Sequence, residues 1–153
     1  MHEDTLLSCL SHKRIIKLID TFDCADSYNM VLQKMDMDLV KYLITYDLSD
    51  NLKQKQRLFK MIAEGVSYIH SMKIVHFDLK LDNILVNVNS HGYVTDLCIS
   101  DFGLSRSFKE FKNSLNFDGT WMYMAPEMYG VDKVFDEKID CWSLGVILYT
   151  ILK

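Results

Sequence analysis

Reactive side chains gather between residues 76 and 101. In the segment His76-Phe77-Asp78-Leu79-Lys80-Leu81-Asp82-Asn83, the carboxylate of Asp78 is followed two residues later by the ammonium of Lys80 and five residues later by the amide of Asn83. A second carboxylate, Asp101, opens an Asp-Phe-Gly tripeptide. A carboxylate can accept a proton, an ammonium neutralises anionic groups, and carboxylate and amide oxygens bind hard cations. Asp78 by itself is typical of a turn.

Two further motifs follow along the chain. The first is Gly119-Thr120-Trp121-Met122-Tyr123-Met124-Ala125-Pro126-Glu127, and the second is Asp140-Cys141-Trp142-Ser143-Leu144-Gly145. Four motifs in this order are far more specific than any one of them alone. The single proline, Pro126, fixes its own φ and predicts a sharp end to the loop before the next helix.

The elements that must position these residues begin with a helix end and two strands. Leu6, Leu7 and Leu10 have helical spacing, and residues 15–22 and 28–32 are rich in β-forming side chains around a turn. A connector over residues 35–39 and a brief helix around 40–43 follow.

A long helix over about residues 52–71, capped by Ser49 or Asp50, is the clearest element. Residues 84–88 and 97–99 are predicted to be strands, joined by a polar loop with Gly92 at its turn. Residues 141–152 form a last helix that is apolar almost all round, which favours a central position. The long helix over residues 52–71 is predicted from apolar residues that form one stripe at helical spacing, namely Leu58, Met61, Ile62, Gly65, Val66 and Ile69. With strands mainly in the first half, helices in the second and no βαβ series, the predicted fold class is α+β.

The composition is that of a weakly acidic globular chain. Its 153 residues are 49% hydrophobic and 25% charged, and the net charge is −4. This length suits one ordinary domain, and the composition excludes collagen-like and disordered chains. The 14 lysines and 3 arginines form no run or stripe, so no nucleic-acid partner is expected.

The four cysteines indicate reduced thiols rather than a disulfide or zinc site. Cys9, Cys24, Cys98 and Cys141 form no Cys-x-x-Cys pair and lack a nearby His at zinc-ligand spacing. Cys98 and Cys141 lie in apolar runs and are expected to be buried. No signal peptide opens the chain, and the longest apolar tract, residues 142–152, is about half a membrane span. We therefore expect an intracellular protein, cytoplasmic or nuclear, without a membrane segment.

In these four motifs the chain resembles the middle of a eukaryotic serine/threonine protein kinase domain. By this resemblance, residues 1–32 correspond to the end of helix C with strands 4 and 5, and residues 33–35 to the hinge. Residues 36–153 then correspond to an incomplete large lobe. The resemblance implies a kinase-like α+β fold that is mostly the helical large lobe, in a chain that is a fragment or a truncated form.

The resemblance also implies roles in phosphoryl transfer from ATP and Mg²⁺. Asp78 would accept or orient the proton of the attacking hydroxyl, and Lys80 would contact the γ-phosphate. Thr120 would sit beside them and favour Ser/Thr acceptors. Asn83 and Asp101 would supply oxygens for Mg²⁺.

Four further residues are assigned to the nucleotide by the same resemblance. Leu85 would form the floor of the adenine pocket, Leu32 would occupy the gatekeeper position, and Gln33 and Met35 would belong to the hinge. Core packing alone explains the two leucines equally well. Asp140 would hold the backbone of the catalytic loop by hydrogen bonds, and Gly103 would permit the backbone torsions at the start of the activation segment.

The departures from the kinase pattern are informative. Phe77 stands where many kinases carry an arginine that binds a phosphorylated residue, and a phenyl ring cannot replace that fork. We therefore predict little dependence on phosphorylation of Ser107 or Ser114. No G-x-G-x-x-G or Val-Ala-x-Lys occurs in the sequence, and Glu3, at the helix C position, has no lysine partner in it.

Two functions remain open at this point. The first is an ATP- and Mg²⁺-dependent serine/threonine kinase that acts on a protein substrate. The second is a catalytically inactive kinase-lobe mimic that binds and regulates a partner kinase or its substrate. The presence of Asp78, Lys80, Asn83 and Asp101 together favours descent from an active enzyme, because a docking lobe has no need of all four.

Overall fold

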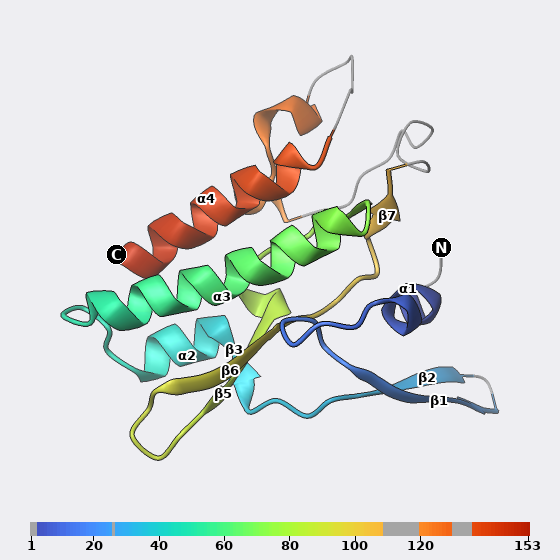
Figure 1. Cartoon of the computed structure of the whole chain (residues 1–153), viewed down its shortest axis with the longest axis horizontal. Coiled ribbons are helices and arrows are strands. Elements are labelled where there is room, and N and C mark those ends of the chain that lie inside the picture. The colour runs from blue at the N-terminus through green and yellow to red at the C-terminus, as the bar shows by residue number, and fades with distance from the viewer. Residues whose placement is uncertain (1–2, 26, 109–119, 130–135) are drawn as a thin grey trace.

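The computed structural model describes residues 3–25, 27–108, 120–129 and 136–153 (Figure 1). The helices are α1 (Glu3–Cys9), α2 (Leu39–Thr45), α3 (Leu52–Ser71) and α4 (Lys138–Leu152). The strands are β1 (Leu18–Cys24), β2 (Ser27–Leu32), β3 (Met37–Asp38), β4 (Ile74–Val75), β5 (Ile84–Val88), β6 (Val94–Ile99) and β7 (Arg106–Ser107). Short 3-10 helices cover Leu81–Asn83, Trp121–Tyr123 and Pro126–Tyr129. The mixture of helices and small antiparallel sheets confirms the predicted α+β class.

The longest helix, α3, has the predicted bounds, and its apolar stripe is buried in the main core. Its cap is Asn51 and not Ser49 or Asp50, because Asn51 accepts the backbone N–H of Gln54 on its side-chain oxygen at 3.0 Å. An oxygen so placed satisfies one of the free amides at the start of the helix. The prediction of the cap was therefore wrong by one to two residues.

A three-stranded antiparallel sheet, with β5 between β3 and β6, packs on the same core as α3. The turn between β5 and β6 contains Gly92 with a positive φ of 78°, a conformation that favours glycine. The carbonyl of Gly92 accepts a hydrogen bond from the fully buried Tyr42 of α2 at 2.9 Å. This bond ties the turn of the sheet to α2.

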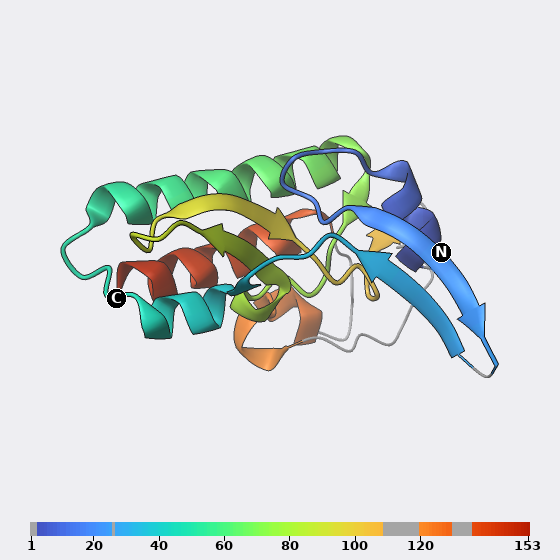
Figure 2. The same ribbon diagram turned by 90° about the horizontal axis from the view of Figure 1, so that it is seen from below.

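The hairpin of β1 and β2 extends away from the rest of the molecule beside α1 (Figure 2). Its strands were predicted, although β1 begins at Leu18 rather than at residue 15. Ile15 and Ile16 are instead buried in the main core, where the amide of Ile16 donates to the carbonyl of Ile99 at 2.9 Å. The chain between α1 and β1 therefore rests on β6.

Helix α4 runs beside α3 in the opposite direction (Figure 1). It is not central in the part of the chain that the structure describes, because Trp142, Tyr149 and Leu152 are exposed. Cys141 is exposed as well, which corrects the expectation that it is buried, whereas Cys98 is buried as expected. An apolar helix sequence predicts contact with other elements but does not specify which faces are covered.

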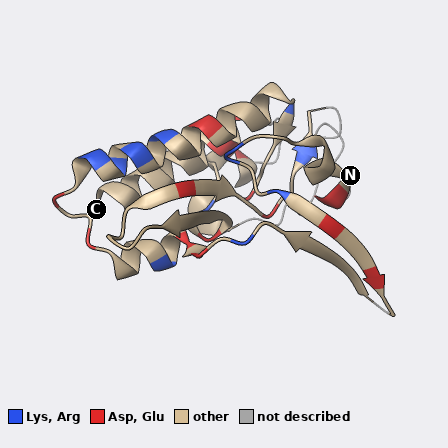
Figure 3. Ribbon diagram, turned by 60° about the horizontal axis from the view of Figure 1, so that its bottom comes forward, with Lys and Arg blue, Asp and Glu red and all other residues tan. Residues whose placement is uncertain are grey.

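Charged side chains are dispersed over the ribbon, with basic positions recurring along the first half of α3 (Figure 3). Lys55, one of these, is buried and donates from its ammonium to the carbonyl of Leu152 at 3.0 Å. A cation suits the C-terminal end of α4, where carbonyls lack helical partners.

None of the helices among residues 3–25, 27–108, 120–129 and 136–153 is long and apolar enough to cross a membrane.

The buried apolar side chains form two clusters. The main core joins α1, α2, α3, α4 and the three-stranded sheet. The second apolar cluster is smaller, and Leu104, Phe108 and Met124 pack against its edge. Its buried members are Val75, Phe77, Ala125, Met128 and Ile139.

Candidate active site

The loop between β4 and β5 is ordered around the buried side chain of His76. Its Nε2 lies 3.1 Å from the carbonyl oxygen of Ser100, and its Nδ1 accepts the amide of Asp78 at 3.3 Å. The proton therefore belongs on Nε2, since a carbonyl cannot donate. Burial lowers the pKa of His76, which keeps the ring neutral at neutral pH.

The carboxylate of Asp140, at the start of α4, holds the backbone of this loop. It accepts the amides of His76 and Phe77 at 2.9 and 3.0 Å, and Nε2 of His70 lies 2.8 Å away. Asp140 is only 1% exposed. The predicted supporting role of Asp140 is confirmed, whereas the participation of His70 from α3 had no signal in the sequence.

Asp78 lies at the centre of the site and receives hydrogen bonds on both carboxylate oxygens. Oδ2 is 2.7 Å from the ammonium of Lys80, and Oδ1 accepts the Thr120 hydroxyl at 2.9 Å. Oδ1 also accepts the amide of Thr120 at 3.2 Å. Burial acts to raise the pKa of Asp78, but the hydrogen bonds from Lys80 and Thr120 outweigh it, so the pKa lies below its ordinary value. Asp78 is thus a carboxylate at neutral pH.

The ammonium of Lys80 joins two of the candidate residues. It lies 3.1 Å from the hydroxyl oxygen of Thr120 as well as 2.7 Å from Asp78. Burial acts to lower the pKa of Lys80, but the hydrogen bond and charge of Asp78, with a smaller contribution from Asp101, raise it overall. The Thr120 hydroxyl can therefore donate to Asp78 while it accepts from Lys80.

Asn83 connects this loop to the strand that precedes Asp101. Its side-chain nitrogen donates to the carbonyl and to Oδ2 of Asp78, at 2.9 and 3.2 Å. Its backbone carbonyl accepts both the amide and the hydroxyl of Ser100, at 2.8 and 3.1 Å. Because the side-chain nitrogen of Asn83 is engaged as a donor, its amide oxygen is the side-chain atom that could bind a cation.

The Asp101-Phe102-Gly103 tripeptide is held between His76 and Glu3. The ring of Phe102 is buried, and its centre lies 4.9 Å from that of the His76 ring. The backbone amide of Phe102 donates to Oε1 of Glu3 at 2.9 Å. Asp101 is exposed and has a positive φ of 61°. Gly103 has no positive φ, so Asp101 is the left-handed residue of the tripeptide.

The side chains of Asn83 and Asp101 form a donor set whose chemistry fits Mg²⁺. The structure shows no group of three or more His, Cys, Asp or Glu residues that could hold an ion in the part of the chain it describes. Asn83 and Asp101 offer one amide oxygen and one exposed carboxylate. Mg²⁺ commonly takes few protein ligands and keeps water or phosphate in its other positions.

Three of the four residues assigned to the nucleotide base border the main core. Leu32, Met35 and Leu85 are half-buried against the main core, and Leu85 pairs with Cys98 in the sheet. The amide of Gln33 donates to the carbonyl of Lys17 at 2.8 Å. Gln33 lines a cavity of about 960 Å³ that lies between α1 and β1. The other three residues assigned to the base do not line this cavity, and neither do Asp78, Lys80, Asn83, Asp101 and Thr120.

Two buried serines, Ser105 and Ser143, support the site, although no signal in the sequence indicated this role. The hydroxyl of Ser105 donates to the carbonyl of His76 at 3.1 Å, and that of Ser143 donates to the carbonyl of Tyr123 at 2.7 Å. The first ties the segment after Gly103 to the loop of Asp78, and the second ties the segment after Thr120 to α4. Ser114 lies outside the described residues, whereas Ser107 belongs to β7.

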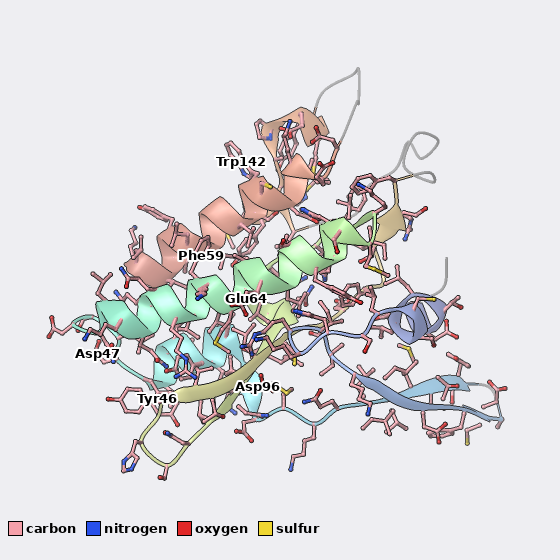
Figure 4. All side chains as sticks on the ribbon, in the orientation of Figure 1. Tyr46, Asp47, Phe59, Glu64, Asp96 and Trp142 are labelled. Carbon is pink, nitrogen blue, oxygen red and sulfur yellow. The ribbon has the colours of Figure 1, made fainter. Side chains whose placement is uncertain are left out.

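Arg14 anchors the segment between α1 and β1 to the large part of the molecule. Its guanidinium lies 3.3 Å from Glu64 of α3 and 2.8 Å from Asp96 of β6, the two carboxylates labelled in Figure 4. This ion-pair triad holds the chain that leads from α1, and hence from Glu3, against α3 and the sheet.

Comparisons with known proteins agree on one family. The family model for the protein kinase domain matches residues 1–153. A probable serine/threonine-protein kinase of Encephalitozoon cuniculi is 36% identical over 98% of this chain, and the ovarian-specific serine/threonine-protein kinase Lok of Drosophila melanogaster is 36% identical over 99% of it.

The similarity extends to solved structures but covers only part of each relative. The crystal structure of the yeast RNA polymerase II CTD kinase CTDK-1 complex contains a chain with a TM-score of 0.85 and 26% identity over 98% of this chain. The chain spans 27% and 32% of the two curated relatives and 48% of the chain in the solved structure.

Proposed function

Since the chain belongs to the protein kinase family, we propose that it carries the catalytic centre for phosphoryl transfer from ATP to serine or threonine hydroxyls of a protein substrate. The observation that carries the proposal is the hydrogen-bonded group of Asp78, Lys80 and Thr120. It combines an ionised carboxylate that can receive a proton with a cation that can face a phosphate.

In this proposal Asp78 accepts the proton of the attacking hydroxyl or orients that hydroxyl. The low pKa of Asp78 suits orientation better than full proton removal, because a weak base takes a proton only late in the transfer. Lys80 neutralises charge on the transferred phosphoryl group. Thr120, bonded to both, sets the space beside Asp78 into which a small aliphatic hydroxyl fits.

Asn83 and Asp101 are the proposed ligands of Mg²⁺. When bound, Mg²⁺ supplies charge neutralisation at the phosphates. The hydrogen bonds of Asn83 to Asp78 and to Ser100 support the assignment, because they hold the amide next to the strand end that carries Asp101.

Leu32, Gln33, Met35 and Leu85 are the proposed contacts of the nucleotide base. By the family resemblance, Gln33 and Met35 belong to the hinge, Leu32 occupies the gatekeeper position and Leu85 forms the floor of the adenine pocket, within the proposed division into residues 1–32, 33–35 and 36–153. Apolar side chains at the edge of the core, such as Leu32 and Leu85, suit a flat aromatic base. An intracellular site of action, cytoplasmic or nuclear, belongs to the same proposal because ATP is its substrate.

The test compares the wild-type chain with Asp78→Asn, Asp101→Ala and the matched control Asp50→Asn. Asp50 is exposed between α2 and α3, away from the site. Nucleotide binding with and without Mg²⁺ is measured by calorimetry, and transfer of labelled phosphate is measured on serine- and threonine-containing proteins. We expect Asp78→Asn to lower transfer at least about 100-fold, Asp101→Ala to abolish Mg²⁺-dependent nucleotide binding, and the control to match wild type.

The competing function is the inactive kinase-lobe mimic that binds a partner kinase or its substrate. If ATP and Mg²⁺ leave the thermal stability of wild type unchanged and no phosphate is transferred, the enzyme proposal is refuted. Capture of a purified protein kinase by this chain would then support the mimic.

A further inference from the structure

Phe77, the residue directly before Asp78, has an unusual backbone conformation. Its φ is 71°, in the left-handed region that bulky side chains rarely adopt. Such a conformation persists only where the surrounding structure enforces it, and it often marks a functional site. The restraints on Phe77 include the hydrogen bond from its amide to Asp140 at 3.0 Å and the packing of its ring, with the residue only 7% exposed, in the second apolar cluster.

The second apolar cluster connects segments that are far apart in the sequence. Leu104 and Phe108 come from the segment after Gly103, whereas Ala125 and Met128 come from the segment after Thr120. Through this cluster the ring of Phe77 connects the loop of Asp78 to both of these segments.

The segment after Gly103 is held against Lys73 and β4, which directly precede the loop of Asp78. Strand β7 pairs with β4, with Arg106 opposite Val75. The amide of Phe108 donates to the carbonyl of Lys73 at 2.9 Å, and the ammonium of Lys73 lies 5.6 Å from the centre of the Phe108 ring. The guanidinium of Arg106 donates to the carbonyls of Gly103 and Ser105 at 3.4 and 2.8 Å.

We propose that Phe77 is a positioning residue for the proposed phosphoryl transfer: through the second apolar cluster its ring sets Asp78 against Thr120 and holds both flanking segments in place. The inference rests on the proposed function for its catalytic consequence. The residues of the cluster are all apolar, and the nearby cations Lys73 and Arg106 already have partners in the protein. Apolar burial therefore holds the arrangement together.

The catalytic test uses Phe77→Ala, Phe77→Arg and the conservative Phe77→Leu. The matched control is Ile151→Ala, which shortens a side chain that is 2% exposed in the main core and outside the second apolar cluster. We expect Phe77→Ala and Phe77→Arg to lower kcat on the order of 100-fold, the effect of a small misplacement of a catalytic group. The KM for ATP stays within about twofold, Phe77→Leu restores kcat to within about threefold, and the control changes stability but not kcat.

A second readout does not require activity. Hydrogen exchange is measured at the amide of Thr120, which donates to Asp78, and at that of Phe108, which donates to Lys73. In Phe77→Ala both should exchange at least about tenfold faster than in Ile151→Ala, while amides in the middle of α3 exchange equally in the two variants. Equal exchange at Thr120 and Phe108 in the two variants overturns the positioning role.

These readouts separate the two proposals. If wild type transfers no phosphate, the proposed function fails and the exchange measurement alone decides the role of Phe77. If wild type is active, Phe77→Arg with unchanged kcat overturns the inference.

Discussion

Removal of the Asp140 carboxylate is expected to destabilise both the loop of Asp78 and the fold. Asp140 accepts the amides of His76 and Phe77 and lies 2.8 Å from Nε2 of His70, at 1% exposure. In Asp140→Ala the two buried backbone amides lose their acceptor. An unsatisfied buried donor costs about 1–3 kcal/mol, so the two amides cost about 2–6 kcal/mol before the loss of the His70 contact.

Asp140→Asn is a milder change of nearly the same shape. The side-chain oxygen of the new asparagine can still accept from His70 and from the backbone N–H of His76. Its NH₂ group then faces the backbone N–H of Phe77, and that donor is left without an acceptor. The expected cost is about 1–3 kcal/mol. Both changes are large against the total stability of a typical domain, which is about 5–15 kcal/mol.

The assay is urea unfolding followed by circular dichroism, with Asp136→Asn as the control. The side chain of Asp136 is 53% exposed, and its pair with Lys138 at 3.6 Å is expected to contribute less than about 1 kcal/mol. The expected order of stability is wild type, Asp136→Asn, Asp140→Asn and Asp140→Ala. If Asp140→Ala unfolds at the same urea concentration as Asp136→Asn, the reasoning from buried donors is refuted.

Three further predictions concern packing, hydrogen bonding and pH. Gly65→Ala should cost about 1 kcal/mol, because its Cβ would lie 2.7 Å from Cδ1 of Ile99. Gly145→Ala, with no atom of the described residues within 4 Å of the added Cβ, should stabilise the fold by about 0.5–1 kcal/mol. Thermal unfolding of both variants decides whether the space around the added methyl group controls the sign of the change in stability. Tyr42→Phe removes a hydroxyl that donates to a loop carbonyl at 2.9 Å and should cost about 1–2 kcal/mol in urea unfolding. Burial raises the pKa of the Cys98 thiol from 9.0 to about 11, so the unfolded chain loses this proton first, and stability falls as pH rises from about 9 to about 11. Cys98→Ala should therefore lose about 1 kcal/mol less than wild type between pH 8 and pH 10, and an equal loss in the two proteins contradicts the shift.

Local patterns were sufficient for several elements. The bounds of α3 follow from apolar side chains that recur with the period of a helix, and the bounds of β5 follow from a short run of β-forming residues. The cap of α3 was missed because Ser49, Asp50 and Asn51 can all cap a helix. Only the backbone geometry decides which oxygen reaches the free amide.

The two-residue strands β4 and β7 illustrate a different limit. Each is too short to have a periodicity of its own, and each exists because it pairs with the other, about 30 residues away in the chain. The exposure of Cys141 and Trp142 has the same origin. The helix sequence is apolar on all sides, so which side is covered depends on the elements beside it.

The sequence by itself determined the family resemblance, the α+β class and the identity of Asp78, Lys80, Asn83 and Asp101 as candidates, because residue types and short spacings are local properties. The resemblance also placed Thr120 beside Asp78 and Asp140 under the loop of Asp78, but only the tertiary structure decided which atoms meet: the Thr120 hydroxyl donates to Asp78, and Asp140 accepts the amides of His76 and Phe77. The participation of His70 and the burial of Phe77 in a cluster drawn from four separate segments were likewise decided by the tertiary structure. Such contacts depend on how distant segments pack, and no periodicity within one segment encodes the position of another.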